Sequence, residues 1–254
     1  MRVYKFGGAS VKDAAGVRNL LRVLRELKAS EIVVVISAMG KMTNAFESLV
    51  RAYFDEREES KTESLGTAVD AQLKSIKAFH FKIIGDLDFD ESDAINGENQ
   101  QNLDGVRAIL ANNDSPSYDF VYDQVVSRGE LISTRICSAY LEANDMENNW
   151  LDVRDCIKTN NDYRRARVDW NATCREINKR VDRNAITLTQ GFLGGDAEGN
   201  TTTLGREGSD YTSGIFAYCL EASEVSIFKD VPGVLNADPR EFERTQLLNR
   251  ISYK

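Results

Sequence analysis

The feature that most constrains this chain is a strand, a glycine turn, a helix and a second strand at its amino end. Alternation from Arg2 to Phe6 predicts a strand that ends at Gly7 and Gly8. Leucine and valine then recur at helical spacing between Val17 and Leu27. The run Ile32 to Ile36 is continuously aliphatic, which is typical of a parallel strand buried on both faces. The chain therefore opens with a βαβ unit.

Alternation of strands and helices continues to the end of the chain. Helical spacing is predicted over residues 43–85, 99–113, 131–141, 171–181, 209–220 and, as the start of a further helix, 248–254. Strands are predicted at 125–126, 150–153, 185–189 and 224–228, and 200–204 reads as one arm of a hairpin after a Gly194-Gly195 turn.

This order predicts the fold class and the place of the functional site. Alternating strands and helices indicate a three-layer α/β/α sandwich with a mostly parallel central sheet. Ligands of such sheets bind where the carboxyl ends of the strands meet, and the glycine-rich loops of this chain follow strands. Because no internal repeat or proline-rich linker interrupts the pattern, we expect one domain over residues 1–254.

Composition excludes several classes of partner and site. With 32 Lys and Arg against 40 Asp and Glu, the net charge of −8 disfavours nucleic acid and anionic membranes as partners. No stretch has the length of a membrane span or the pattern of a signal peptide, so a cytoplasmic location is expected. The four cysteines form no C-x-x-C pair and are expected to be reduced core thiols, and no metal site is predicted.

The segment KFGGAS places a lysine before a glycine turn and a helix start. Backbone amides at such a turn can hold phosphate oxygens, and Lys5 can reach the β or γ phosphate. The alternative is plain structure, since glycine serves many turns. The spacing is neither Walker A nor G-x-G-x-x-G, which disfavours an NAD-dependent dehydrogenase.

Three further segments carry candidate chemistry. In TTTLGREGSDY, Arg206 can fork a carboxylate while Ser209 offers a donor, although Ser209 or Asp210 can equally serve as a helix cap. SRGE presents Glu130, which can hold an ammonium group or only favour the helix dipole. FKDVPGV and ADPR follow the last strand and are also common turn chemistry.

Two other features are expected to have structural roles and no catalytic one. His80, the one histidine, is expected on the surface or in packing, so no catalytic triad is predicted. The cluster of Arg164, Arg165 and Arg167 is expected to be a solvated face, with phosphate binding as the lesser alternative.

Together these motifs resemble the amino-acid kinase superfamily and, within it, the aspartate kinases. KFGGAS, VVVISAMGKMTN, SRGELIST, WLDVRDCIKT, TQGFLGGDAEGNTTTLGREGSDYT and FKDVPGVLNADPR occur in the family's order and spacing over nearly the whole chain. The resemblance implies transfer of the ATP γ-phosphoryl group to the side-chain carboxylate of L-aspartate. It also implies Mg²⁺ held mainly by ATP and water, a homo-oligomer, and no general base, because the carboxylate is already a nucleophile.

The resemblance implies a role for each site residue. Lys5 and Asp210 would be catalytic, Lys5 reaching the phosphoryl group and Asp210 orienting it or the substrate. Arg206 would bind the α-carboxylate of aspartate and Glu130 its α-ammonium group. The remaining substrate residues would be Ser37, Thr43, Phe192 and Ser209, and the nucleotide residues Gly7, Gly8, Ser10, Lys229, Asp230, Leu235 and Arg240, with Lys5.

The chain departs from the family pattern at a few places and leaves alternatives open. Ala9, Glu207, Lys229 and Leu235 stand where threonine, glycine, threonine and tyrosine are frequent. Family members continue with a lysine-bearing nucleotide segment and paired regulatory ACT domains, so we expect a kinase domain cut short at its carboxyl end. Another acid kinase of the same fold, such as a glutamate-type kinase, and a non-catalytic aspartate- or nucleotide-binding fragment remain alternatives.

Overall fold

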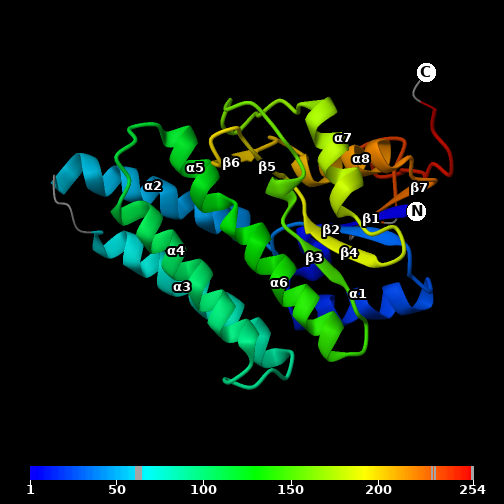
Figure 1. The fold of residues 1–254 in the computed structure, drawn as a ribbon, viewed down its shortest axis with the longest axis horizontal. Helices are drawn as coiled ribbons and strands as arrows, with labels where there is room; N and C mark the ends of the chain where they lie inside the picture. The colour runs from blue at the N-terminus through cyan, green and yellow to red at the C-terminus, as the bar shows by residue number, and fades with distance from the viewer. Residues whose placement is uncertain (61–64, 230, 232, 253–254) are drawn as a thin grey trace.

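A five-stranded parallel sheet forms the centre of the computed structural model, which describes residues 1–60, 65–229, 231 and 233–252 (Figure 1). The strands are β1 (Arg2–Phe6), β2 (Ile32–Ile36), β3 (Asn149–Leu151), β4 (Ile186–Gln190) and β7 (Glu224–Phe228). They lie in the order β3-β4-β2-β1-β7, with every neighbouring pair parallel. All five residues of β2 are buried, as its continuous aliphatic sequence predicted.

Helices cover both faces of this sheet, which makes the predicted three-layer α/β/α sandwich. The covering helices are α1 (Ala14–Glu26), α6 (Arg128–Ala143), α7 (Trp170–Arg180) and α8 (Gly208–Leu220) (Figure 1). Strand alternation divides the core: Tyr4 and Val34 pack in the cluster that includes α1 and α6. Their neighbours Val3, Val33 and Val35 pack in the second cluster, with residues of α7 and α8.

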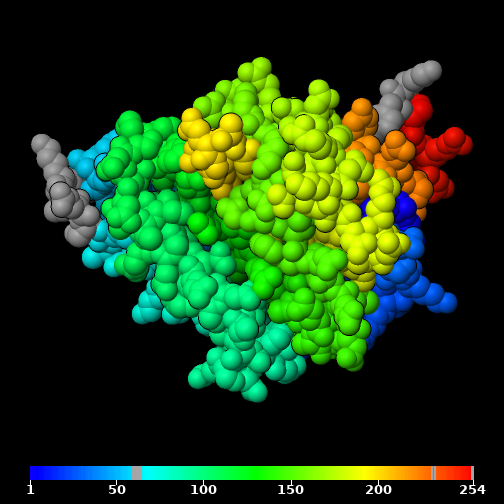
Figure 2. All heavy atoms as spheres, in the orientation of Figure 1, coloured from blue at the N-terminus to red at the C-terminus, as the bar shows by residue number. Residues whose placement is uncertain are grey.

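The middle of the chain forms a helical extension on one side of the sheet. It consists of α2 (Met42–Ser60), α3 (Thr67–Asp86), α4 (Ala94–Ala111) and α5 (Tyr118–Val126) (Figure 1, left). A separate antiparallel hairpin joins β5 (Leu193–Gly195) to β6 (Thr201–Thr203). Its tip at residues 197–199 is exposed, gold in Figure 2. Short 3₁₀ turns occupy Gly8–Val11 and Val153–Asp155.

Most predicted elements are present, and three predictions were wrong. The strand at Val125 and Val126 is instead the end of α5, a short helix buried on nearly all sides that gives no amphipathic period. Gly194 and Gly195 are not a turn but part of β5. Residues 248–252 form no helix, and 253–254 lie outside the described residues.

The prediction for the cysteines was wrong in part, whereas the histidine lies in packing, one of its two predicted places. Cys174 and Cys219 form a disulfide that joins α7 to α8, so the prediction of reduced thiols was wrong for this pair. Their separation of 45 residues hides the contact from sequence patterns. Cys137 and Cys156 are free and buried. His80 is fully buried in packing. Within the described ranges, no helix is both long and apolar enough to span a bilayer.

Candidate active site

A cavity of about 370 Å³ opens where the chain leaves β1 and β2 and enters α8. All eight side chains predicted for catalysis and substrate binding line it: Lys5, Ser37, Thr43, Glu130, Phe192, Arg206, Ser209 and Asp210. Glu130 comes from the first turn of α6, although its segment was predicted to follow a strand. Segments more than 200 residues apart in sequence therefore meet in one pocket.

Two lysines share one carboxylate at this pocket. Lys5 Nζ lies 2.6 Å from Oδ1 of Asp210, and Lys229 Nζ lies 2.9 Å from Oδ2. Burial disfavours ionisation of Asp210, but the two ammonium groups outweigh it and lower the pKa of the carboxyl below its usual value. Asp210 is therefore an anion that holds two cations in place.

Glu130 is a buried acid with one unused oxygen. Its Oε1 accepts a bond of 3.3 Å from the Ala38 amide, whereas Oε2 has no hydrogen-bond partner. Burial raises the pKa of Glu130 to about 8, against smaller opposing effects of the Ala38 amide and the Thr43 hydroxyl. An acid of this kind is neutral in the empty pocket at pH 7 and ionises when a cation such as an ammonium group arrives.

The segment that leads into α8 supplies a positive charge and hydrogen-bond donors to the same pocket. Arg206 is exposed and makes no ion pair with any residue that the structure describes, so its guanidinium is free to fork an anion. Ser209 follows at the positive end of the helix dipole. Gly191 and Gly208 allow this close approach, because a Cβ on them would lie 2.4 Å from Ser209 and 2.5 Å from Phe192.

A further wall of the pocket was missed by sequence reasoning. Arg164 lines the cavity while its side chain stays 40% exposed, so this arginine belongs to the pocket as well as to the predicted solvated face. Its backbone has a φ of +65°, and its amide donates to Asp123 Oδ2 at 2.9 Å. The same carboxylate accepts from the Thr203 amide and hydroxyl. The guanidinium of Arg164 lies 4.4 Å from the ring centroid of Tyr122, which also lines the pocket. No spacing in the sequence links these residues.

The glycine turn after β1 lies beside the lysine pair. A Cβ on Gly7 would lie 3.4 Å from Lys5 Nζ, so the turn passes close to the ammonium group. A Cβ on Gly8 would meet the Ala38 carbonyl oxygen at 2.6 Å, which explains why glycine is needed there. Ser10 Oγ donates to the Phe228 carbonyl at 3.3 Å. The turn therefore joins the ends of β1 and β7.

The other predicted nucleotide residues lie away from the cavity lining. Leu235 forms an isolated bridge with Leu247. Arg240 is exposed and pairs with Asp238 at 2.7 Å. Asp230 lies outside the described residues. The structure thus gathers Lys5, the glycine turn and Lys229, and it leaves Leu235 and Arg240 in the segment after β7.

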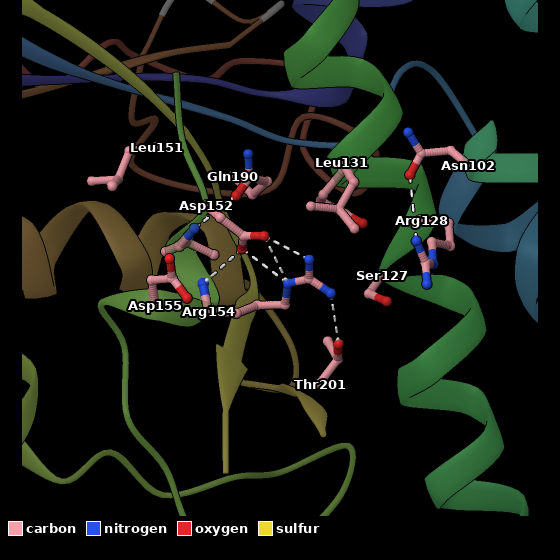
Figure 3. A network of polar contacts seen from close by, with 12 residues as sticks. Asn102, Ser127, Arg128, Leu131, Leu151, Asp152, Arg154, Asp155, Gln190 and Thr201 are labelled. Atoms are coloured by element: carbon pink, nitrogen blue, oxygen red, sulfur yellow. Dashed lines mark hydrogen bonds and ion pairs between the residues drawn. The ribbon is translucent and has the colours of Figure 1, made fainter. Parts of the chain in front are cut away.

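A polar network anchors the helix that carries Glu130, and Figure 3 shows the part of it around Arg154. Gln190 at the end of β4 donates to Thr134 Oγ1 of α6 at 2.8 Å and accepts from the Val153 amide at 2.8 Å. Arg154 then pairs with Asp152 at 2.6 Å and donates to Thr201 Oγ1 of β6 at 3.1 Å. The network therefore fixes α6, β4 and the hairpin relative to one another.

The described residues contain no group of three or more His, Cys, Asp and Glu side chains that could hold a metal ion. Asp210, the acid nearest the lysines, is already paired with both of them. These residues do not form a metal-binding cage, so a magnesium ion at this site would take its ligands from phosphate oxygens and water.

Comparison with known proteins finds that the chain is similar to members of one family. The family model described as the amino acid kinase family matches residues 1–254. The lysine-sensitive aspartokinase 3 of Escherichia coli is 30% identical over 255 residues, covering 99% of this chain and 54% of its own length. The aspartokinase of Chlamydia muridarum is 30% identical over 254 residues, with 99% and 53% covered.

Solved structures give the same result. The chain superposes with a TM-score of 0.85 on E. coli aspartokinase III in complex with aspartate and ADP. The two are 30% identical, and the match covers 98% of this chain and 53% of that one. The chain therefore spans about half the length of these relatives.

Proposed function

The chain belongs to the amino acid kinase family, and we propose that it transfers the γ-phosphoryl group of ATP to the side-chain carboxylate of L-aspartate. One observation carries this proposal: Lys5, Glu130 and Arg206 converge on a single cavity. Their charges complement a phosphoryl group, an ammonium group and a carboxylate. The E. coli relative that shares the fold binds aspartate and ADP, which supports the same pair of ligands here.

Each polar group of aspartate has a partner in the pocket. Arg206 forks the α-carboxylate, and Glu130 accepts the α-ammonium group with its unpartnered Oε2. The side-chain carboxylate then points toward Lys5, assisted by Ser37, Thr43 and Ser209, and Phe192 closes the apolar side. Requiring both an ammonium and a carboxylate separates an amino acid from a simple dicarboxylate.

Phosphoryl transfer needs positioning and positive charge rather than a general base. One carboxylate oxygen of aspartate attacks the γ-phosphorus, and the bond from this phosphorus to the β,γ-bridging oxygen breaks, leaving ADP. Lys5, fixed by Asp210, offsets the charge of the equatorial phosphoryl oxygens. The amides of Gly7 and Gly8, with Ser10, hold the remaining phosphates. A magnesium ion held by ATP and water would neutralise part of the phosphate charge.

The setting of the enzyme is part of the proposal. The product, 4-phospho-L-aspartate, would begin the route to lysine, threonine and methionine in the cytoplasm. Because the relatives are about twice as long, we propose that residues 1–254 supply the catalytic domain and that regulatory ACT domains and homo-oligomer contacts belong to the full-length protein. Leu235 and Arg240, in the segment after β7, are proposed to lie beside the adenine nucleotide.

Steady-state kinetics of ADP release test these roles. We expect Arg206→Ala to raise the KM for aspartate about thirtyfold, equal to about 2 kcal/mol, with a smaller effect on kcat. Lys5→Ala should chiefly lower kcat. Arg167→Ala is the matched control, since Arg167 is a surface arginine whose side chain is 81% exposed. Equal, small effects of Arg206→Ala and Lys5→Ala would contradict the pocket.

A further inference from the structure

A second ammonium group stands beside Lys5. Asp210 lies between them, with Lys5 at 2.6 Å from one oxygen and Lys229 at 2.9 Å from the other. Lys229 does not line the cavity itself, but a single carboxylate separates it from Lys5, so the two ammonium groups stand together at the edge of the pocket where Asp210 lies. This placement differs from the sequence expectation, which put Lys229 with the adenine-side residues.

The backbone holds Lys229 at the same point as the phosphate turn. Strand β7 pairs with β1 so that Phe228 lies opposite Phe6, and Lys229 follows directly. The Gly7 amide donates to the Phe228 carbonyl at 3.3 Å, and the Ser10 hydroxyl donates to the same oxygen. The position of Lys229 is therefore tied to the turn that we propose holds the nucleotide phosphates.

The side chains of the two lysines differ in how far they are exposed to solvent. The side chain of Lys5 is 6% exposed, whereas that of Lys229 is 43% exposed. The one other acid beside Lys229 in the described part of the chain is Glu207, at 3.7 Å with a side chain that is 74% exposed, so solvent weakens this second contact. Lys229 can leave Asp210 for another anion, and the carboxylate then still has an ion-pair partner because Lys5 stays paired with it.

We propose that Lys229 binds the transferring γ-phosphoryl group, moving from Asp210 to phosphate oxygens when ATP enters the site. This inference rests on the proposed function only in taking ATP as the nucleotide. No bond to Lys229 forms or breaks and its ammonium keeps its protons. The charge that develops on the equatorial oxygens is then shared by two ammonium groups rather than one. Lys229 is a catalytic residue in this account, not an adenine contact.

Nucleotide binding tests the inference without any turnover. The dissociation constants of the Mg²⁺ complexes of AMP-PNP, which carries a γ-phosphate, and ADP, which lacks one, are measured by calorimetry on the whole chain. We expect the unaltered protein to prefer AMP-PNP. Lys229→Met should raise the dissociation constant of AMP-PNP at least tenfold and that of ADP less than twofold. Lys229→Arg should keep most of the preference for AMP-PNP over ADP.

The control is Lys82→Met, which removes the same charge and also breaks a lysine–aspartate pair, with Asp86, on the exposed surface of α3. It should change neither constant. If Lys229→Met fails to fold, as judged by thermal unfolding, Lys229→Gln replaces it as a polar variant of similar length.

Two results would overturn the inference. In the first, the unaltered protein binds AMP-PNP no more tightly than ADP, including the case in which it binds neither. In the second, the Lys229 variants lose affinity for AMP-PNP and for ADP by the same factor. That result would place the lysine against the part that the two nucleotides share and not against the γ-phosphate. Loss of aspartate-dependent turnover with the AMP-PNP preference intact would instead reject the proposed substrate and leave the role of Lys229 standing.

Discussion

The protonation of Glu130 should make aspartate affinity depend on pH. Burial raises the pKa of this carboxyl to about 8, and its Oε2 has no partner in the pocket. The empty site therefore carries a proton on Glu130 at neutral pH, whereas the site with an ammonium group bound requires the carboxylate. Binding must release this proton, so affinity rises with pH until Glu130 is ionised in the empty protein.

The size of the effect follows from the ionised fraction. For a pKa of about 8, that fraction falls about 25-fold between pH 8.5 and pH 6.5, which is equal to about 1.9 kcal/mol of binding free energy. Aspartate keeps its two carboxylates over this range, and it keeps its ammonium group because the ammonium of a free amino acid is less acidic than a peptide amino terminus. Asp123 is a buried acid that binds the pocket residues Arg164 and Thr203, and burial raises its pKa to about 6, so it stays mainly ionised above pH 6.5.

Calorimetric titration of L-aspartate at several pH values measures this dependence. We expect the dissociation constant of the unaltered protein to fall about 25-fold from pH 6.5 to pH 8.5. Glu130→Gln should bind weakly at all of these pH values, so that the two proteins differ least at pH 6.5. A dissociation constant that stays flat in the unaltered protein would refute the reasoning, as would an equal slope in Glu130→Gln.

Three further predictions concern stability. Burial lowers the pKa of His80 to about 4, so the folded state loses up to about 3 kcal/mol as pH falls from 6.5 to 4, and His80→Leu should flatten this part of the denaturation profile. Gly191→Ala should cost about 1–3 kcal/mol in urea unfolding by pushing on the first turn of α8, while Gly85→Ala, whose Cβ would meet nothing within 4 Å, should not destabilise. Opening the Cys174–Cys219 disulfide with Cys174→Ser should cost about 2–4 kcal/mol in the same assay under non-reducing conditions.

The sheet was largely predictable because its strands carry strong local signals. Ile32 to Ile36 is aliphatic throughout, and such a run fits a central parallel strand. Helix α1 keeps a clear apolar stripe from Val17 to Leu24. Helix α5 is the counterexample: it is short and buried on most sides, so Val125 and Val126 resembled a strand. Burial on all sides removes the periodicity by which a helix is recognised.

The pocket was predictable only where motifs occur in the sequence. Glycine-containing motifs indicated Lys5, Glu130 and Arg206, and the fold brings them together, although the strand predicted before Glu130 is the end of α5. Arg164 could not be placed in this way, because its position depends on a backbone bond to Asp123, 41 residues away. The pairing of Lys229 with Asp210 likewise depends on the register of β7 against β1, which no local pattern encodes.

The most direct test of the central claim is the identity of the phosphorylated product. The protein is incubated with Mg-ATP and hydroxylamine, which traps an acyl phosphate as a hydroxamate, in the presence of L-aspartate, L-glutamate or N-acetylglutamate. We predict ADP release and hydroxamate with L-aspartate alone. Hydroxamate with another acid but none with aspartate would contradict the proposed substrate, and nucleotide binding with no hydroxamate from any acid would contradict catalysis by this chain.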